Sequence, residues 1–214
     1  MTIYRRLHRR FGPRHWWPAE TPFEVVVGAV LTQNTAWTNV ERAIANLKQA
    51  RALTPERLLT APLTQIARWI RPAGYFNLKA RRLWAVVAWW RANPPRVTRR
   101  RPLLPLRQEL LDVYGVGPET ADSILLYALG RPSFVVDAYT KRIFARHGWV
   151  RREAGYDEIQ QTFTRALPAR APLYNEYHAL LVELGKHFCR PHQPNCQACP
   201  LRDLGTLRLE PGAR

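Results

Sequence analysis

Apolar residues recur every three or four positions along most of the chain, which is the spacing of amphipathic helices. Between residues 38 and 50, one helical face would carry the side chains of Val40, Ala43, Ile44 and Leu47. The pattern predicts further helices over residues 21–33, 79–93, 106–114, 118–129, 137–148, 156–167 and 175–188. No run alternates convincingly as a half-buried strand does, and no repeat of solenoid length occurs. The sequence therefore predicts an all-α fold.

Threonine and proline residues mark one helix start and one linker. Thr21 is expected to be the N-cap of the helix over 21–33, with Pro22 in its first position. Prolines interrupt the helical pattern between residues 93 and 105 and predict a linker there. The linker contains Arg99, Arg100 and Arg101. Such a charge run is either a solvated loop or a contact for phosphate groups.

The charge balance indicates the kind of partner. The chain has 33 Lys and Arg residues against 16 Asp and Glu, a net charge of +17 at pH 7. So large an excess favours a polyanion, either nucleic acid or an anionic membrane surface. No segment approaches the ~20 apolar residues of a membrane-spanning helix, and the basic stretch 1–17 lacks the apolar core of a secretion signal. We expect a cytoplasmic monomer without a membrane partner.

A glycine pair separates two of the predicted helices. Gly115, Val116 and Gly117 lie between the helices over 106–114 and 118–129. Glycines allow a tight turn, Val116 would pack inward, and the hairpin amides would face one phosphate together with the second helix N-terminus. In a chain this basic, a helix–hairpin–helix favours binding to the DNA backbone without reading sequence.

Asp137 follows the apolar run 134–136 and precedes a predicted helix. It is expected to be the N-cap of that helix, which is a common use of aspartate. A carboxylate at such a position can also stabilise a developing cationic sugar and orient a water molecule. The structural role as N-cap and the catalytic role are compatible with each other.

Four motifs carry a resemblance to a known family: LTQNTAW at 31–37, RPAGYFNLKARRL at 71–83, GVGPETADSILLYA at 115–128 and VVD at 135–137. They resemble the helix–hairpin–helix DNA glycosylases of the endonuclease III superfamily, most closely the endonuclease III-like 3-methyladenine DNA glycosylases. The resemblance covers roughly residues 16–205.

The resemblance implies two interleaved helical subdomains with DNA across a cleft between them. Residues 22–131 would form the central subdomain, including the helix–hairpin–helix at 104–129. Residues 1–21 and 132–214 would form the second, which ends in a cysteine loop at 189–205.

Glu119 stands where the bifunctional members of this family have a lysine. That lysine forms a Schiff base with the sugar and leads to strand cleavage, which a carboxylate cannot do. The resemblance therefore implies a monofunctional enzyme without AP-lyase activity. Alternatively, Glu119 is simply an acid in the first turn of a helix, favoured by the helix dipole.

Aromatic and polar residues near the motifs are expected to handle the damaged base. By resemblance, Trp17 with Pro18 would stack on one side of an extruded base and Trp37 on the other, with Trp16 beside them. Core burial is the alternative for these tryptophans. The residues expected to fill the gap in the duplex are Gln33, Tyr75, Phe76 and Asn77. Further DNA contacts are expected from Thr120, Lys79 and Arg101.

Three cysteines, Cys189, Cys196 and Cys199, lie close together near the end of the chain. They cannot all pair in disulfides, which favours a metal site in a reducing compartment. By resemblance they are three of the four thiolates of a [4Fe–4S] cluster, and Gly205 occupies the fourth position. We expect an iron–sulfur cluster with a structural role, and a cysteine at 205 is expected to raise its iron content.

Other ligand sets remain open at this point. Asp203, His192 or an exogenous ligand would complete the cluster, or a three-iron form would result. Zinc with His187 or His192 as fourth ligand is a further alternative, as is a degenerate loop with free thiols.

The expected function is base excision repair by a DNA glycosylase that acts on duplex DNA with a flipped, alkylated base. One alternative is a glycosylase for oxidised or mismatched pyrimidines with weak or no AP-lyase activity. Another is a non-catalytic relative that binds damaged DNA.

Overall fold

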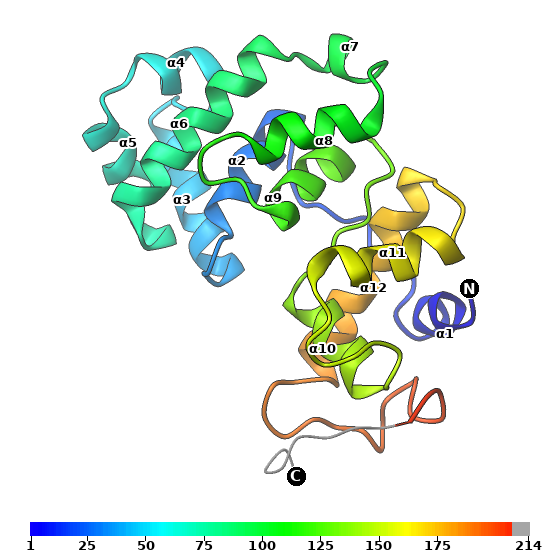
Figure 1. The fold of residues 1–214 in the computed structure, drawn as a ribbon. Coiled ribbons are helices and arrows are strands. Elements are labelled where there is room, and N and C mark those ends of the chain that lie inside the picture. The colour runs from blue at the N-terminus through cyan, green and yellow to red at the C-terminus, as the bar shows by residue number, and fades with distance from the viewer. Residues whose placement is uncertain (207–214) are drawn as a thin grey trace. The chain divides into compact units, whose positions relative to one another are not determined.

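The computed structural model describes residues 1–206 and shows helices and connecting loops, with no strand among these residues (Figure 1). The predicted all-α class is confirmed. The chain divides into two compact units, which we call unit 1 (Met1–Trp16 and Pro132–Arg214) and unit 2 (Trp17–Arg131). Within the described residues, no helix is long and apolar enough to cross a bilayer.

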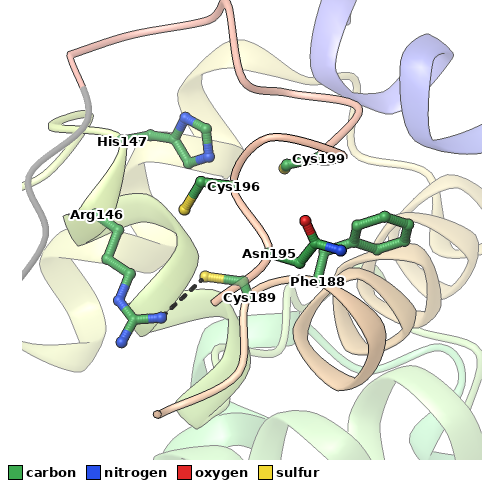
Figure 2. Close-up of a pocket in the computed structure, with 7 residues that line it drawn as sticks. All are labelled: Arg146, His147, Phe188, Cys189, Asn195, Cys196 and Cys199. Atoms are coloured by element: carbon green, nitrogen blue, oxygen red, sulfur yellow. Dashed lines mark hydrogen bonds between the residues drawn. The ribbon is translucent and has the colours of Figure 1, made fainter. Parts of the chain in front are cut away.

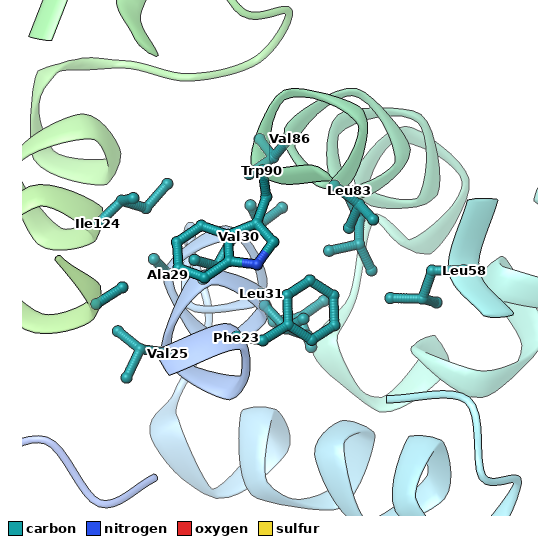
Figure 3. Close-up of a cluster of buried hydrophobic side chains, with 14 of the residues drawn as sticks. Phe23, Val25, Ala29, Val30, Leu31, Leu58, Leu83, Val86, Trp90 and Ile124 are labelled. Carbon is teal, nitrogen blue, oxygen red and sulfur yellow. The ribbon is translucent and has the colours of Figure 1, made fainter. Parts of the chain in front are cut away.

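Helix α2 (Pro22–Leu31) is the buried centre of unit 2. Its residues from Phe23 to Leu31 are all buried, because the helix is apolar on nearly every face. The helices packed against it are α3 (Trp37–Gln49), α6 (Phe76–Ala92), α9 (Pro118–Ser123) and η2 (Ile124–Ala128). Figure 3 shows side chains of α2, among them Val30 and Leu31, in the core that α6 shares. The Thr21 hydroxyl accepts a hydrogen bond from the Glu24 amide (3.1 Å), which confirms the predicted N-cap.

Several short elements of unit 2 were not predicted. These are α4 (Pro55–Thr60), α5 (Leu63–Trp69), η1 (Arg71–Ala73) and α7 (Pro95–Thr98). Each has at most seven residues, too few for a helical period to be read from the sequence. The predicted linker therefore contains one helical turn, α7.

The two helices around the glycine pair are held together by a buried ion pair. Arg107 of α8 (Leu103–Leu111) makes two hydrogen bonds, of 2.9 and 3.1 Å, to the fully buried carboxylate of Asp122 in α9. The predicted helix over 118–129 is present, but its second half, η2, has π-helical geometry. Removing one partner of such a pair is costly because it leaves a buried charge behind.

Unit 1 consists of α1 (Thr2–Phe11), α10 (Ala138–Arg146), α11 (Tyr156–Ala166) and α12 (Ala171–His187). Helix α12 packs against both α1 and α10. The core of unit 1 is aromatic. The rings of Phe134 and Phe163 are stacked there, with their centroids 3.8 Å apart. Helix α1 was not predicted, because it is basic and only Leu7 is buried.

Candidate active site

Asp137 is the N-cap of α10, and its carboxylate lies close to polar groups of α10 and α12 in unit 1. Its Oδ1 accepts a hydrogen bond from the Thr140 amide (2.7 Å), as expected of an N-cap. Its Oδ2 lies 3.5 Å from Nε2 of His178 on α12. Burial acts to raise the pKa of the Asp137 carboxyl, but the charge of His178 and the hydrogen bonds from His178 and Thr140 outweigh it, so the pKa lies below its ordinary value. The carboxylate is therefore ionised at neutral pH.

Sequence reasoning missed His178. A single histidine among the apolar residues of a helix carries no signal of its own, and this residue is buried. Its proximity to Asp137 comes from the packing of α10 against α12, which no local pattern encodes.

Of the two glycines in the hairpin, only Gly115 has a backbone conformation that requires glycine. Gly115 has φ +79°, and a Cβ added there would lie 2.2 Å from Cγ of Arg82. Gly117 has φ −97° and open space around it. Val116 is 8% exposed and belongs to the core of unit 2.

Gln33 holds this hairpin in place. Its Nε2 donates to the Gly115 carbonyl and to Oγ1 of Thr120, both at 3.0 Å, and Arg82 donates to its Oε1 at 2.6 Å. Gln33 was expected to fill the gap left by a flipped base, but its amide is engaged at both ends and acts as a brace. Thr120 was also expected to contact DNA, and its side chain is buried against Gln33.

Lys79 and Arg101 were expected to contact DNA, and both side chains make hydrogen bonds within unit 2. Lys79 is 1% exposed, and its ammonium donates to the carbonyls of Leu31 and Ala73, both at 2.8 Å. Burial lowers the pKa of Lys79 to about 8. The Arg101 guanidinium is paired with Glu109 and donates to Asn93.

The neighbouring Arg99 and Arg100 are exposed. The segment that bears them is held by Arg131, which donates to the carbonyls of Thr98 (2.9 Å) and Arg101 (2.7 Å). They are better placed than Arg101 for an electrostatic contact.

Three aromatic residues of unit 2 meet near the start of α3. The Trp17 ring lies edge-on to Trp37, with centroids 5.3 Å apart and planes at 82°, and contacts Tyr127 at 5.1 Å. The Trp37 indole donates to Glu41 (2.8 Å). The expected sandwich of a base between Trp17 and Trp37 is not formed here, because these rings touch and are not parallel. Tyr127 was missed, since an aromatic residue in an apolar helix is usually core.

Trp16 and Pro18 are the other two predicted pocket residues. Trp16 belongs to unit 1, where Nζ of Lys186 lies 5.3 Å from the centre of its ring. Pro18 is exposed in the loop that follows Trp17. The sequence alone gave no reason to separate Trp16 from Trp17.

Tyr75 precedes α6 in an unusual backbone conformation. It has φ +45°, in the left-handed region, and it is 70% exposed. Non-glycine residues in this region cost on the order of 1 kcal/mol and often mark functional sites. Phe76 is half-buried with the Arg71 guanidinium 6.0 Å from its ring, and Asn77 is exposed. Tyr75 is thus the candidate wedge that extends from the surface, while Phe76 packs back onto it.

Glu119 lies in the first turn of α9 and is exposed. The helix dipole favours an acid there. No lysine occupies this position, as the sequence already shows.

The three cysteines line one cavity of unit 1, together with Arg146, His147, Phe188 and Asn195 (Figure 2). Cys189 and Cys199 are buried, and Arg146 donates to Sγ of Cys189 (3.6 Å). Burial raises the pKa of Cys196 and of Cys199, so their thiolates need a cation or metal to be stable. Buried thiols that face one cavity fit the donor set of an iron–sulfur cluster.

A single metal ion fits less well. Within residues 1–206, no three His, Cys, Asp or Glu side chains converge closely enough to hold one. Each ligand of a cluster binds its own iron atom, so the ligands can be further apart.

None of the expected fourth ligands lines the cavity. His187 is exposed and lies 3.3 Å from Glu183, His192 is exposed, and Asp203 is bound to Arg6. Gly205 cannot be replaced by cysteine without strain. It has φ +76°, and an added Cβ would lie 2.3 Å from the His147 carbonyl oxygen.

Comparisons with known proteins show the family of the chain. A family model described as HhH-GPD superfamily base excision DNA repair protein matches residues 27–169. A protein of Methanocaldococcus jannaschii with the provisional name of DNA repair glycosylase is 50% identical over 206 residues, covering 94% of this chain and 93% of the relative.

Two solved structures are also similar. H. pylori 3-methyladenine DNA glycosylase (MagIII) bound to 1,N6-ethenoadenine is 28% identical with a TM-score of 0.72, covering 86% of this chain and 96% of that one. Endonuclease III trapped as a covalent intermediate with DNA shares the fold, with a TM-score of 0.81 at 24% identity, covering 95% and 92%.

Proposed function

The chain belongs to the HhH-GPD superfamily of base excision DNA repair proteins, and we propose that it is a monofunctional DNA glycosylase that hydrolyses the N-glycosidic bond of alkylated bases in duplex DNA. The observation that carries this proposal is the environment of Asp137, a largely buried carboxylate that His178 and the Thr140 amide keep ionised.

A largely buried, ionised carboxylate suits the chemistry of base release. Positive charge develops on the sugar as the bond to the base breaks, and a fixed negative charge stabilises it. Asp137 can also accept a hydrogen bond from the water that attacks the anomeric carbon and take its proton. The electrons of the broken bond leave with the base. A base made cationic by alkylation departs as a neutral molecule, so no acid is needed to protonate it.

Two further features support alkylated bases as substrates. Trp17, Trp37 and Tyr127 form an aromatic cluster at one end of α3, and aromatic faces attract electron-poor, cationic bases. A base would stack on an outer face of this cluster or displace one of its rings. In addition, the H. pylori relative is a 3-methyladenine DNA glycosylase bound to an ethenoadenine.

The lack of strand cleavage follows from Glu119. A lysine amine is needed there to form a Schiff base with the sugar, and a carboxylate makes no imine. The product would be an intact strand with an abasic site.

DNA contacts would come from groups that the fold leaves accessible. The amides of the hairpin and the N-terminus of α9 suit a phosphate, and the exposed Arg99 and Arg100 add positive charge nearby in the sequence. Tyr75 would fill the gap in the duplex. The three cysteines would hold an iron–sulfur cluster, which would cross-link the end of unit 1 without entering the reaction.

A single-turnover assay on labelled duplexes tests the proposal. Each duplex carries one modification: 3-methyladenine, 1,N6-ethenoadenine, thymine glycol, uracil or a preformed abasic site. We expect release of an alkylated base, with strand breaks only after alkali. Release confined to thymine glycol or uracil would establish the pyrimidine alternative, and tight binding without any release would establish a non-catalytic relative.

A further inference from the structure

We propose that His147 supplies the fourth ligand of the iron–sulfur cluster, through Nε2, in place of the thiolate that Gly205 cannot provide. This inference rests on the cluster named above and adds a ligand of a different type. It predicts a cluster held by three cysteines and one histidine.

The place of His147 in the cavity is the first argument. It lines the same cavity as Cys189, Cys196 and Cys199, and its ring is 3% exposed. Figure 2 shows its imidazole turned toward the side on which Cys196 and Cys199 lie. Among the described residues, it is the only histidine in the lining of this cavity.

The tautomer of the ring is the second argument. Nδ1 lies 2.7 Å from the carbonyl oxygen of Leu204. A carbonyl oxygen only accepts, so Nδ1 carries a proton, and in the neutral ring the lone pair lies on Nε2. A histidine whose other nitrogen donates to a carbonyl is the usual arrangement in metal sites, because that bond orients the ring. Binding iron through Nε2 therefore forms one bond and releases no proton from His147.

The packing around Gly205 is the third argument. The His147 ring stacks on Trp149 at 4.5 Å, and the Thr206 amide donates to the His147 carbonyl at 3.0 Å. A Cβ at residue 205 would lie 2.3 Å from that same carbonyl oxygen and 2.5 Å from Nε1 of Trp149. The glycine thus lets the loop close against the His147 carbonyl and Trp149, and it leaves no room for a side chain at its own position.

The test uses full-length protein that is purified without oxygen and whose cluster is then reduced. We expect four irons per chain, and pulsed electron paramagnetic resonance should detect one strongly coupled histidine nitrogen, identified by 15N-histidine labelling. The coupling should disappear in His147→Cys, which keeps four irons. It should persist in His187→Ala, the matched control on the exposed end of α12.

A second readout is the reduction potential. A neutral imidazole in place of a thiolate makes the cluster less negative, which raises its potential. The parent should therefore have a higher potential than His147→Cys. His147→Ala should lose one iron and give a three-iron signal after oxidation.

Absence of nitrogen coupling in a four-iron parent would overturn the proposal, as would a three-iron signal from the parent itself. Protein that contains no iron would overturn the proposal as well, and it would also exclude the iron–sulfur cluster on which the proposal rests. Base release is measured separately on the same preparations, so each of these results is distinguishable from a failure of the glycosylase assignment.

Discussion

The Oδ2 atom of Asp137 and the Nε2 atom of His178 lie 3.5 Å apart, and they join the start of α10 to the middle of α12. Both side chains are largely buried, at 13% and 7% exposure. This pair and the Thr140 amide keep the carboxylate ionised in a place where burial alone would favour its neutral form.

Asp137→Asn should slow base release by about a hundredfold or more, because an amide neither balances the sugar's positive charge nor accepts a proton from water. DNA affinity should stay near that of the parent, since phosphate contacts dominate binding. Single-turnover release and fluorescence anisotropy measure the two quantities. Asp157→Asn, an exposed acid in the first turn of α11, is the control. Equal release by parent and variant would exclude a catalytic role for Asp137.

His178→Gln should shift the acid limb of the release-rate profile to higher pH. The positive charge of His178 lowers the pKa of Asp137, and its loss lets that pKa rise. The acid-induced loss of folding stability should likewise begin at a higher pH in His178→Gln than in the parent. A carboxyl whose pKa is lowered from 3.8 stabilises the fold above that pH and loses this contribution as the pH falls through the folded value. His187→Gln on the same helix should leave both profiles unchanged, and an unshifted profile in His178→Gln would show that the pair has no such influence.

Borohydride should trap no crosslink between the parent protein and lesion-containing DNA, because Glu119 cannot form an imine. Glu119→Lys should give a crosslink, since it places an amine at the family's lysine position. Denaturing gels of the trapped reactions measure both. An efficient crosslink by the parent would reveal another amine, and Lys141→Gln would then test the exposed lysine of α10.

Gly115→Ala should lower both the thermal stability and the DNA affinity. The left-handed backbone costs alanine about 1–2 kcal/mol, and the new methyl group would overlap Arg82, which also braces Gln33. Gly117→Ala is the matched control, because its φ is −97° and nothing lies near its Cβ. Melting curves should separate the two variants, and equal losses would mean that the backbone of Gly115 has no special role.

The buried ammonium of Lys79 should make stability rise with pH between about 8 and 10.5. In that window the unfolded chain still binds a proton that the folded chain has lost, so deprotonation favours folding. Urea unfolding at several pH values should show a smaller slope for Lys79→Met than for the parent. Lys48→Met is the contrast, because hydrogen bonds to Glu20 and Glu24 raise the pKa of Lys48. An unchanged slope in Lys79→Met would mean that this amine titrates as it does in solvent.

Local patterns were enough for the helical class and for several helix ends. The apolar faces of α3 and α6 and the cap at Thr21 depend only on residues within a few positions of each other, so the sequence predicted them directly. Motif spacing likewise located the glycine hairpin, Asp137 and the three cysteines. In each case the signal and the structure it specifies lie in the same short segment.

Tertiary packing decided how these segments act, because it joins residues that are far apart in the chain. His178 acquires its role only when α12 lies against α10, and Lys79 is withdrawn from the surface only because the carbonyls of Leu31 and Ala73 surround it. The conformation of Gly205 excludes the cysteine that spacing alone suggested and leaves His147 beside the thiols. Burial and long-range hydrogen bonds, which local sequence does not encode, thus determined which of the chemically suitable residues are available for function.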